Sequence, residues 1–397
     1  IGIKYTPIKT IVAKPGTIEI LNKILNNKTA YKNISAFGDY LDNAGISQDI
    51  KIKKDGSIEI HGNMPGKSVQ QFINITQEQL MLPAFDHETF SGIKEIVKSN
   101  LQTLKSNPKE AINKVMYGDS TLGYTTKDVL ANIDNVTLDD VKQLYNDIMQ
   151  NSTATVAVAT TMDENIKSIV NNSFAQMPMV QKQTHALKQT HKTIEKSTVE
   201  TTTEPNAQAE IIQAYNFKTS NNIEDDIKFS LMNQILCRGD ETGLFNNLRE
   251  KEKLAYAVHS QYETRGNNSV ISCHILTTTD NEDTKEYTPE NVQKSINGFT
   301  KQINKMKNGE FSEKELEAAK KELKITLKEL TYKQQFKENA LLNGLNSPYG
   351  VDLLNKKYEL IDKITKADIQ CAAQYAFGGK PIYAITASQK TLDANKE

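Results

Sequence analysis

The sequence lacks the motifs by which many enzymes are recognised directly. Neither HExxH nor HxxEH occurs, so a zinc site of those types carried by one helix is absent, and the six histidines are scattered. The three cysteines, Cys237, Cys273 and Cys371, form no CxxC pair, which favours small buried side chains over a disulfide framework or a zinc knuckle. The stretch GNMPGK at 62–67 lacks the spacing of a phosphate-binding loop and is typical of a turn.

An excess of charge of one sign is also missing. The 48 basic and 49 acidic residues leave a net charge of -1, which argues against a nucleic-acid partner. No apolar run approaches the roughly 18 residues of a membrane span, and no signal peptide is visible. The chain begins at Ile1 rather than Met, so we expect a processed chain or a fragment. Cytoplasmic and periplasmic locations both stay open.

What is present indicates two domains. A chain of 397 residues is long for one hydrophobic core. Residues 181–205 are rich in Thr, Lys and Gln and poor in large apolar side chains, which is typical of a linker. We therefore predict domains at 1–180 and 206–397, joined by this linker.

The two halves show a similar order of elements. Apolar spacing in the first predicts helices at 17–26, 34–44, 68–80, 86–106, 108–116, 126–132, 138–149 and up to about 176, with a hairpin across 50–62 and a strand at 153–160. The second predicts strands at 209–217, 267–278 and 381–387, and helices at 224–237, 289–331 (broken near Gly309 and Ser312), 350–361 and 366–377. The fold class is therefore α+β: two homologous domains, each an antiparallel-rich sheet covered by helices.

The stretch ETGLFNNLREKEKLAYAV at 241–258 predicts an amphipathic helix that runs into a strand. By alternation, one strand face is expected to carry Leu254, Tyr256, Val258 and Ser260. Arg249 and Tyr256 could be ordinary surface residues. Alternatively, a short turn could aim both into one cleft, where a guanidinium and a phenol could hold a carbonyl or stabilise an oxyanion. The mixed Glu and Lys residues of 313–330 predict a solvated helix face.

Residues 237–277 resemble the C-terminal-type domain of the pitrilysin/insulinase zinc metallopeptidases, the inverzincins that include mitochondrial processing peptidase. The shared pattern is a Gly followed by an Arg-Glu pair, a short turn, a Tyr seven residues after the Arg, and a second strand. The resemblance implies the LuxS/MPP-like metallopeptidase fold. It also implies that Arg249 and Tyr256 come from a domain without zinc and contact substrate across a closed chamber.

The first half resembles the zinc-binding domain type of the same family, with its ligands replaced. Aligned on Thr29, the HxxEH positions hold Glu19, Asn22 and Lys23, and the downstream Glu ligand falls near Asn100, before Asn107-Pro108. Zinc needs unprotonated nitrogen, thiolate or carboxylate donors, and a Lys ammonium repels the ion. The resemblance therefore implies no zinc on this chain.

The resemblance implies the zinc-less half or subunit of a pitrilysin-type metalloendopeptidase. Its partners would be a peptide substrate and either a homologous half or subunit that carries HxxEH and zinc, or a second copy in a homodimer. Alone, the chain is not expected to hydrolyse peptides. Two alternatives stay open: an inert scaffold subunit, and a peptide-binding module that uses an exposed sheet edge. The family usually has two strands before the zinc helix, whereas only about sixteen residues precede it here, so either the fold is trimmed or the chain is a fragment of a longer protein.

Overall fold

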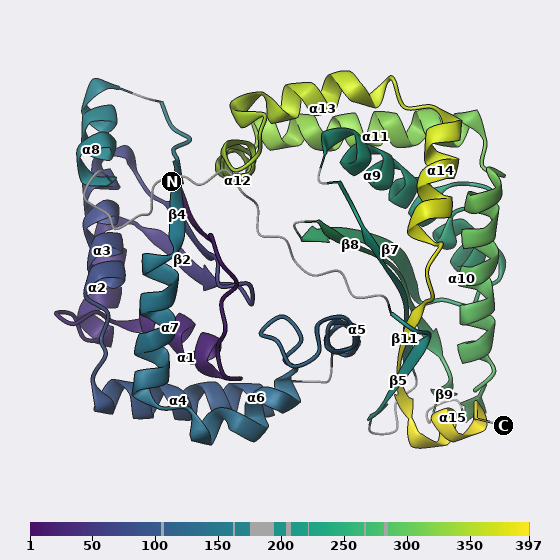
Figure 1. Ribbon diagram of the computed structural model, residues 1–397, viewed down its shortest axis with the longest axis horizontal. Helices are drawn as coiled ribbons and strands as arrows, with labels where there is room; N and C mark the ends of the chain where they lie inside the picture. The colour runs from purple at the N-terminus through teal and green to yellow at the C-terminus, as the bar shows by residue number, and fades with distance from the viewer. Residues whose placement is uncertain are drawn as a thin grey trace. The chain divides into compact units, whose positions relative to one another are not determined.

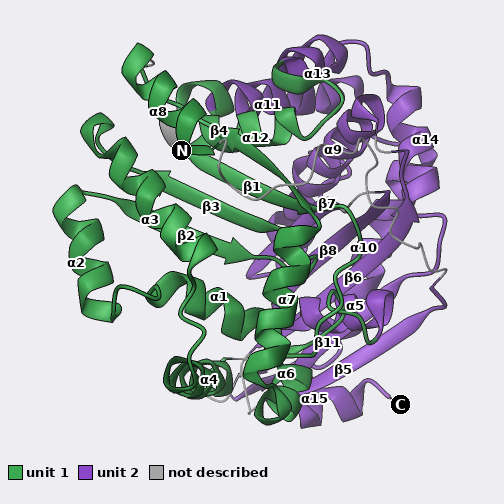
Figure 2. Cartoon of the chain, turned by 60° about the vertical axis from the view of Figure 1, so that its left-hand side comes forward, with its two compact units in different colours: residues 1–104, 119–187, 330–351 green, residues 105–118, 188–329, 352–397 purple. Residues whose placement is uncertain are grey.

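The chain folds into two compact units that are not contiguous in sequence. The computed structural model describes residues 1–104, 107–161, 163–174, 194–203, 208–220, 222–265, 267–281 and 285–396. Unit 1 comprises residues 1–104, 119–187 and 330–351, and unit 2 comprises 105–118, 188–329 and 352–397 (Figure 2). Each unit thus contains a segment from the other half of the chain.

Unit 1 is built on a four-stranded sheet in the order β2-β3-β1-β4, in which all neighbours are antiparallel. The strands are β1 (Gly2–Pro7), β2 (Ser47–Ile52), β3 (Ile58–Asn63) and β4 (Ser152–Ala157). The predicted hairpin is confirmed. Its turn is fixed by Asp55, whose carboxylate accepts hydrogen bonds from the Ser57 amide and hydroxyl at 2.9 and 2.6 Å, and by Gly56 at φ 84°.

One face of this sheet forms the core of unit 1 with several helices. Ile3, Tyr5, Ile58 and Ile60 point into the same buried cluster as the apolar stripe of the first helix. The helices of the unit are α1 (Thr17–Asn27), α2 (Ile34–Ala44), α3 (Val69–Met81), α4 (His87–Gln102), α6 (Thr126–Asn132), α7 (Leu138–Gln150), α8 (Glu164–Phe174) and α12 (Gln334–Leu345) (Figure 1).

Helix α12 packs against β1 and β4 although it comes from the second half of the chain. His61 on β3 holds Glu338 of this helix, with 2.5 Å between Nδ1 and Oε1. Gly2 leaves room for Leu342, because a Cβ at that position would lie 2.8 Å from Leu342 Cδ1. Both β1 and α12 are additions to the elements predicted from the sequence.

Unit 2 contains a five-stranded sheet in the order β5-β11-β6-β8-β7. The strands are β5 (Ser197–Thr203), β6 (Gln208–Lys218), β7 (Ala257–Arg265), β8 (Asn268–Thr278) and β11 (Ile382–Ser388); β9 (Asp280–Asn281) and β10 (Glu286–Tyr287) form a separate pair. Neighbours are antiparallel except β5 and β11, which are parallel. Strand β11 is buried at every position, which explains its nearly unbroken apolar sequence, and β6 is buried without a break at 211–215.

Helices cover both faces of the unit 2 sheet (Figure 1). The helices of this unit are α5 (Pro108–Tyr117), α9 (Ile223–Arg238), α10 (Asn291–Asn308), α11 (Glu313–Tyr332), α13 (Leu353–Ile361), α14 (Lys366–Ala376) and α15 (Gln389–Ala394). Helices α9, α10 and α14 contact β6, β7 and β8. Helix α5, from the first half of the chain, places Ile112 and Met116 in an apolar cluster with Ile212, Ala214, Ile382 and Ala384.

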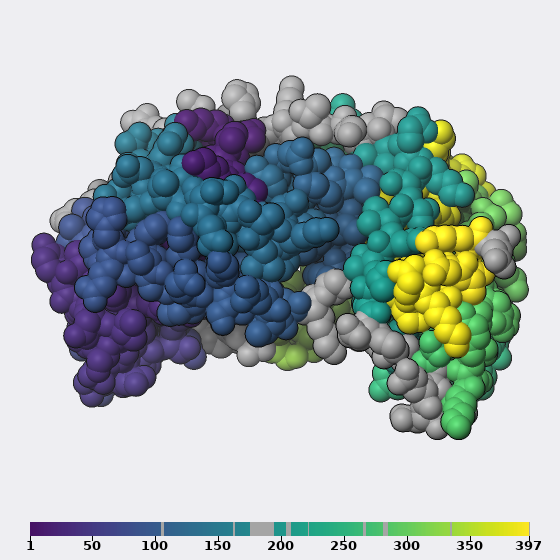
Figure 3. Space-filling model, turned by 90° about the horizontal axis from the view of Figure 1, so that it is seen from below, coloured from purple at the N-terminus to yellow at the C-terminus, as the bar shows by residue number. Residues whose placement is uncertain are grey.

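Strand β5 lies within residues 181–205, whose composition predicts a linker; residues 181–193 and 204–205 lie outside the described residues. Its seven residues alternate between half-buried and exposed positions, as expected for an edge strand. Helix α15 packs against it, with Thr202 Oγ1 2.8 Å from Gln389 Oε1 (Figure 3, yellow beside teal).

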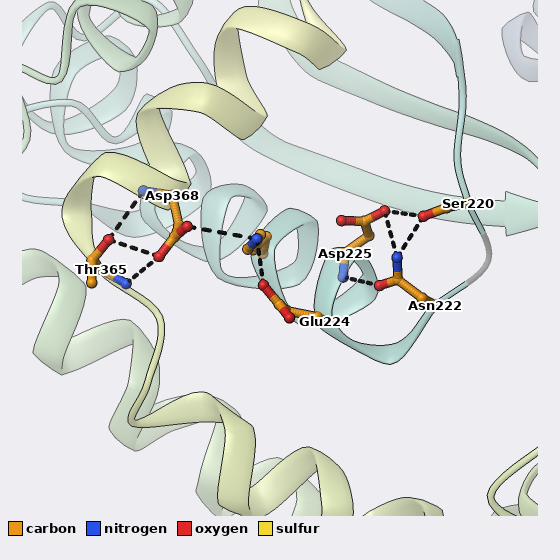
Figure 4. Close-up of polar contacts among 7 residues, drawn as sticks. Ser220, Asn222, Glu224, Asp225, Thr365 and Asp368 are labelled. Carbon is orange, nitrogen blue, oxygen red and sulfur yellow. Dashed lines mark hydrogen bonds and ion pairs between the residues drawn. The ribbon is translucent and has the colours of Figure 1, made fainter.

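Side-chain caps fix the N-termini of α9 and α14, and Lys228 forms ion pairs with an acidic residue near each of these N-termini (Figure 4). Asn222 caps α9 by accepting from the Asp225 amide at 2.7 Å, and Thr365 with Asp368 forms a capping box at α14. Lys228 lies 2.6 Å from Glu224 and 3.6 Å from Asp368. The acidic residues Glu224, Asp225 and Asp368 therefore serve to cap and join the two helix ends.

The predicted α+β class with antiparallel-rich sheets is confirmed. The predicted helices and strands are present with ends shifted by a few residues. The break near Gly309 and Ser312 separates α10 from α11, and Gly309 ends α10 at φ 69°.

Candidate functional site

Arg249 lies on a short π-helix, η3 (Phe245–Lys251), rather than on a regular α-helix. Its guanidinium carbon is 5.1 Å from the centre of the Phe245 ring, and its Nε is 3.8 Å from Glu250 Oε1. The side chain remains 46% exposed. A π-helix is rare and is often found at functional sites, because the extra residue per turn redirects the side chains that follow.

A tight turn ends this helix and leads to Tyr256. The Glu252 and Leu254 amides donate to Asn247 O at 3.0 Å and to Leu248 O at 2.9 Å. Lys253 has φ 55°, the left-handed conformation that ends many helices. The Tyr256 amide then donates to Leu276 O at 2.8 Å, directly before β7 begins. The backbone between Arg249 and Tyr256 is therefore fixed by main-chain hydrogen bonds.

The prediction that Tyr256 shares one strand face with Leu254, Val258 and Ser260 is wrong. Leu254, Val258 and Ser260 are buried as expected, whereas Tyr256 is 70% exposed. The physical reason is that Tyr256 lies in the bend before Ala257, so the alternation of the strand does not yet apply. Among the described residues no hydrogen bond or cation–π contact joins Arg249 and Tyr256. Both side chains are exposed.

A buried carboxylate positions the segment that leads into η3. Glu315 is 6% exposed. Its Oε1 accepts from the Glu241 and Thr242 amides at 2.9 and 3.3 Å, while its Oε2 accepts from the Ser312 amide and hydroxyl at 2.7 and 3.0 Å. Burial alone raises the pKa of Glu315, but the hydrogen bonds from Ser312, Glu241 and Thr242 lower that pKa overall. Glu315 therefore stays ionised while it holds the loop.

Glycine is required in the same loop. A Cβ on Gly239 would lie 2.5 Å from Glu315 Oε1, and one on Gly243 would lie 2.2 Å from Gly239 O. The prediction of a solvated face for 313–330 is thus wrong at Glu315, which packs inward. The capping-box pattern Ser312-x-x-Glu315 is the sequence signal that could have indicated a structural role.

The positions aligned with the zinc ligands have other roles in unit 1. Asn22 on α1 accepts a hydrogen bond from the Ile52 amide at 2.8 Å. Asn26, one turn later, accepts from the Ile50 amide at 3.0 Å and donates to Ile50 O at 2.7 Å. Strand β2 is an edge strand. These two side chains therefore pair backbone groups of a sheet edge.

The residues present do not fit a zinc ion. Lys23 brings an ammonium group to the helix face that carries Glu19, and the Asn22 carbonyl oxygen is already used by the Ile52 amide. Asn100 is exposed in the last turn of α4. In the described part of the chain, no group of three or more His, Cys, Asp or Glu side chains could hold a metal ion.

Two stacked histidines occupy the face of the unit 2 sheet that α5 covers. The rings of His259 and His274 lie 4.6 Å apart and nearly parallel. Burial, with smaller contributions from His259 and Lys109, lowers the pKa of His274 to about 3. Its Nε2 is 2.7 Å from Ser272 Oγ, and both residues line a cavity of about 20 Å³, room for about one water molecule. This polar cluster is too enclosed to receive a peptide.

Residues 135–323 match the family model described as the Peptidase M16 inactive domain. None of the curated proteins compared with the sequence matches it. Among solved structures, a protease from Helicobacter pylori superposes with a TM-score of 0.78 at 13% identity, covering 97% of this chain and 93% of that one. An M16 inactive domain from Pseudomonas fluorescens gives a TM-score of 0.77 at 16% identity, with 98% and 93% covered.

The periplasmic protease PqqL of Escherichia coli gives a TM-score of 0.72 at 13% identity. The match covers 98% of this chain but only 43% of that one. The resemblance predicted from the sequence is confirmed: residues 135–323 match the M16 inactive-domain model, and the fold is similar to that of the solved M16 structures. Among its described helices, none is long and apolar enough to cross a membrane.

Proposed function

We propose that this chain is the zinc-less half of an M16-type metalloendopeptidase that closes a peptide chamber against a partner. Two observations support the proposal. The family model that matches describes an inactive domain, and this chain is similar to less than half of the longer protease PqqL. The partner would be a homologous half or subunit that carries HxxEH, or a second copy would complete a homodimer.

The single observation that carries the proposal is the corner formed by η3, the turn and the start of β7. It presents a guanidinium and a phenol seven residues apart on a fixed backbone, and both remain exposed. Arg249 could hold a substrate carbonyl with its planar donors, and Tyr256 could donate a hydrogen bond to a developing oxyanion. The partner's zinc would supply the activated water.

Reconstitution with the HxxEH-bearing half tests the proposal. We expect Arg249→Ala and Tyr256→Phe each to lower kcat for peptide hydrolysis by about 10²-fold or more, as loss of an oxyanion donor does. Matched controls are Arg238→Ala and Tyr332→Phe, which alter exposed side chains elsewhere and should leave kcat unchanged. The chain alone should show no peptidase activity; zinc-dependent turnover by the purified chain, abolished by a chelator, would overturn the proposal.

The second candidate is a scaffold subunit of the same fold. It is favoured by the absence, in the described residues, of a direct contact between Arg249 and Tyr256, since Arg249 stacks on Phe245 instead. Unchanged turnover in both variants would support the scaffold. The third candidate is a peptide-binding module that would use the edge strand β7. Peptide binding without turnover in any reconstituted complex would support that alternative.

A further inference from the structure

A pocket of about 390 Å³ opens beside the turn that joins Arg249 to Tyr256. One wall is the turn itself and the other is one face of α10. The lining residues are Glu252, Lys253, Leu254, Asn291, Lys294, Asn297, Gly298 and Lys301.

Helical spacing brings the α10 side chains to this pocket. Asn291, Lys294, Gly298 and Lys301 are three or four residues apart, so they share one helix face. Gly298 allows the helix to approach η3, because a Cβ there would lie 2.4 Å from Leu248 Cδ2. The lysines on either side of Gly298 are therefore brought next to the turn.

The pocket carries more positive than negative charge. Lys301 Nζ is 3.9 Å from Glu252 Oε1, and Lys294 Nζ is 3.4 Å from Glu290 Oε1, with both lysine side chains mostly exposed. Lys253 forms no ion pair with any described carboxylate. The lining thus holds three ammonium groups and a single carboxylate, that of Glu252, which leaves the pocket able to attract an anion.

We propose that this lysine pocket, formed around Lys253, Lys294 and Lys301, binds a carboxylate of the peptide substrate. The carboxylate would be an acidic side chain or the C-terminus. The proposal rests on the proposed function, because the pocket lies directly beside the corner that would contact the substrate. A single compact carboxylate suits the site better than a polyanion, since the Glu252 carboxylate also lines the pocket.

Peptide binding to the purified chain tests this, with no need for the partner. The probes are three fluorescein-labelled peptides of one length: one with two Glu residues, the same peptide with Gln in their place, and the Glu peptide with an amidated C-terminus. We expect the Glu peptide to bind to wild type about tenfold more tightly at low salt than to a variant with Lys253, Lys294 and Lys301 all changed to Gln. Salt should weaken wild-type binding.

The matched control changes Lys321, Lys356 and Lys363 to Gln, three exposed lysines of unit 2 away from the pocket. It alters net charge equally and should bind like wild type. Weaker binding of the Gln peptide identifies the side-chain carboxylates as the ligand, and weaker binding of the amidated peptide identifies the C-terminus. The single variants Lys294→Gln and Lys301→Gln, with folding checked by circular dichroism, give the same test if the triple variant misfolds.

The proposal is overturned if the three peptides bind wild type equally, if none binds, or if the control variant loses as much affinity as the pocket variant. Its failure is distinguishable from failure of the proposed function. If the pocket variant loses peptide binding while Arg249→Ala leaves turnover unchanged, the lysine pocket is supported and the catalytic role of Arg249 is rejected. If the pocket variant binds peptide like wild type while Arg249→Ala lowers turnover, only the proposal of the lysine pocket is rejected.

Discussion

At the scale of single residues, the geometry of the corner depends on a charge that lies away from it. Glu315 joins the first turn of α11 to the loop before η3, and none of its hydrogen-bond partners is a positive group. Backbone amides and a hydroxyl stabilise the buried carboxylate instead of a salt bridge. The Glu315 carboxylate thus fixes the backbone of the loop that leads into η3, the helix that carries Arg249.

We expect Glu315→Ala to cost about 1–3 kcal/mol, because the Glu241 and Thr242 amides lose their acceptor. Hydrogen exchange at these two amides should accelerate, as mass spectrometry of the peptide that contains them can show. Since the pKa of Glu315 is lowered in the fold, its stabilisation is present above the unfolded pKa and is lost as pH falls through the folded pKa. The control Glu322→Ala, at an exposed position of the same helix, should change neither the stability nor the exchange of the two amides.

Asn22 gives a second prediction at this scale. Asn22→Ala should destabilise unit 1 by about 1 kcal/mol and speed exchange of the Ile52 amide, because that amide loses its acceptor. Lys23→Ala on the same helix is the control, and we expect little change. Equal effects of the two substitutions would show that the edge contact is unimportant.

At the scale of elements, each sheet packs against a helix from the other half of the chain. Helix α12 contacts the unit 1 sheet through His61 and Glu338, and this hydrogen bond is the main cause of a raised pKa of His61. A raised histidine pKa means that protonated His61 stabilises the docked helix. The stabilisation is fully present below the unfolded pKa of about 6.5 and is lost as pH rises through the folded pKa.

We expect the stability advantage of wild type over His61→Gln to be about 1 kcal/mol at pH 5.5 and to shrink as pH rises, since Gln can hydrogen-bond Glu338 but carries no charge. Thermal unfolding of both proteins across pH 5.5 to 9 measures this difference. An advantage that grows with pH would contradict the assigned contact. His87→Gln, at an exposed position on α4, should leave the pH profile unchanged.

Local sequence patterns were sufficient for most elements but not for these contacts. Helices with a clear apolar stripe, such as α1 and α7, and the Asp55-Gly56 hairpin follow from periodicity and turn chemistry. Strand β5 has no large apolar residue except Val199, and it forms by pairing with β11. The inward position of Glu315 and the exposure of Tyr256 depend on distant neighbours. Arg249 and Tyr256 were identified through the family resemblance, because their local chemistry is ordinary.

At the scale of the whole molecule, the two compact units cannot be separated by one cut in the chain. Residues 105–118 belong to unit 2 and residues 330–351 to unit 1. Division at the predicted linker would remove α5 from the apolar cluster of Ile212, Ala214, Ile382 and Ala384. It would also remove α12 from β1 and β4.

We therefore expect a fragment of residues 119–397 to aggregate more than a fragment of residues 105–397, because only the longer one keeps Ile112 and Met116 over that cluster. The two fragments differ only by the segment with α5, which makes them a matched pair. Light scattering and dye binding to exposed apolar surface measure the difference. Equal solubility would show that the sheet face is stable uncovered.

The position of β11 in the unit 2 sheet has a consequence for biosynthesis. This strand lies between β5 and β6 but follows all the other strands of the sheet in the sequence. Until residues 382–388 are made, β6 keeps one unpaired edge and β5 has no neighbour in the sheet. The nascent chain must therefore hold an open sheet edge through the synthesis of the five helices α10 to α14, which makes this edge a natural point for chaperone assistance.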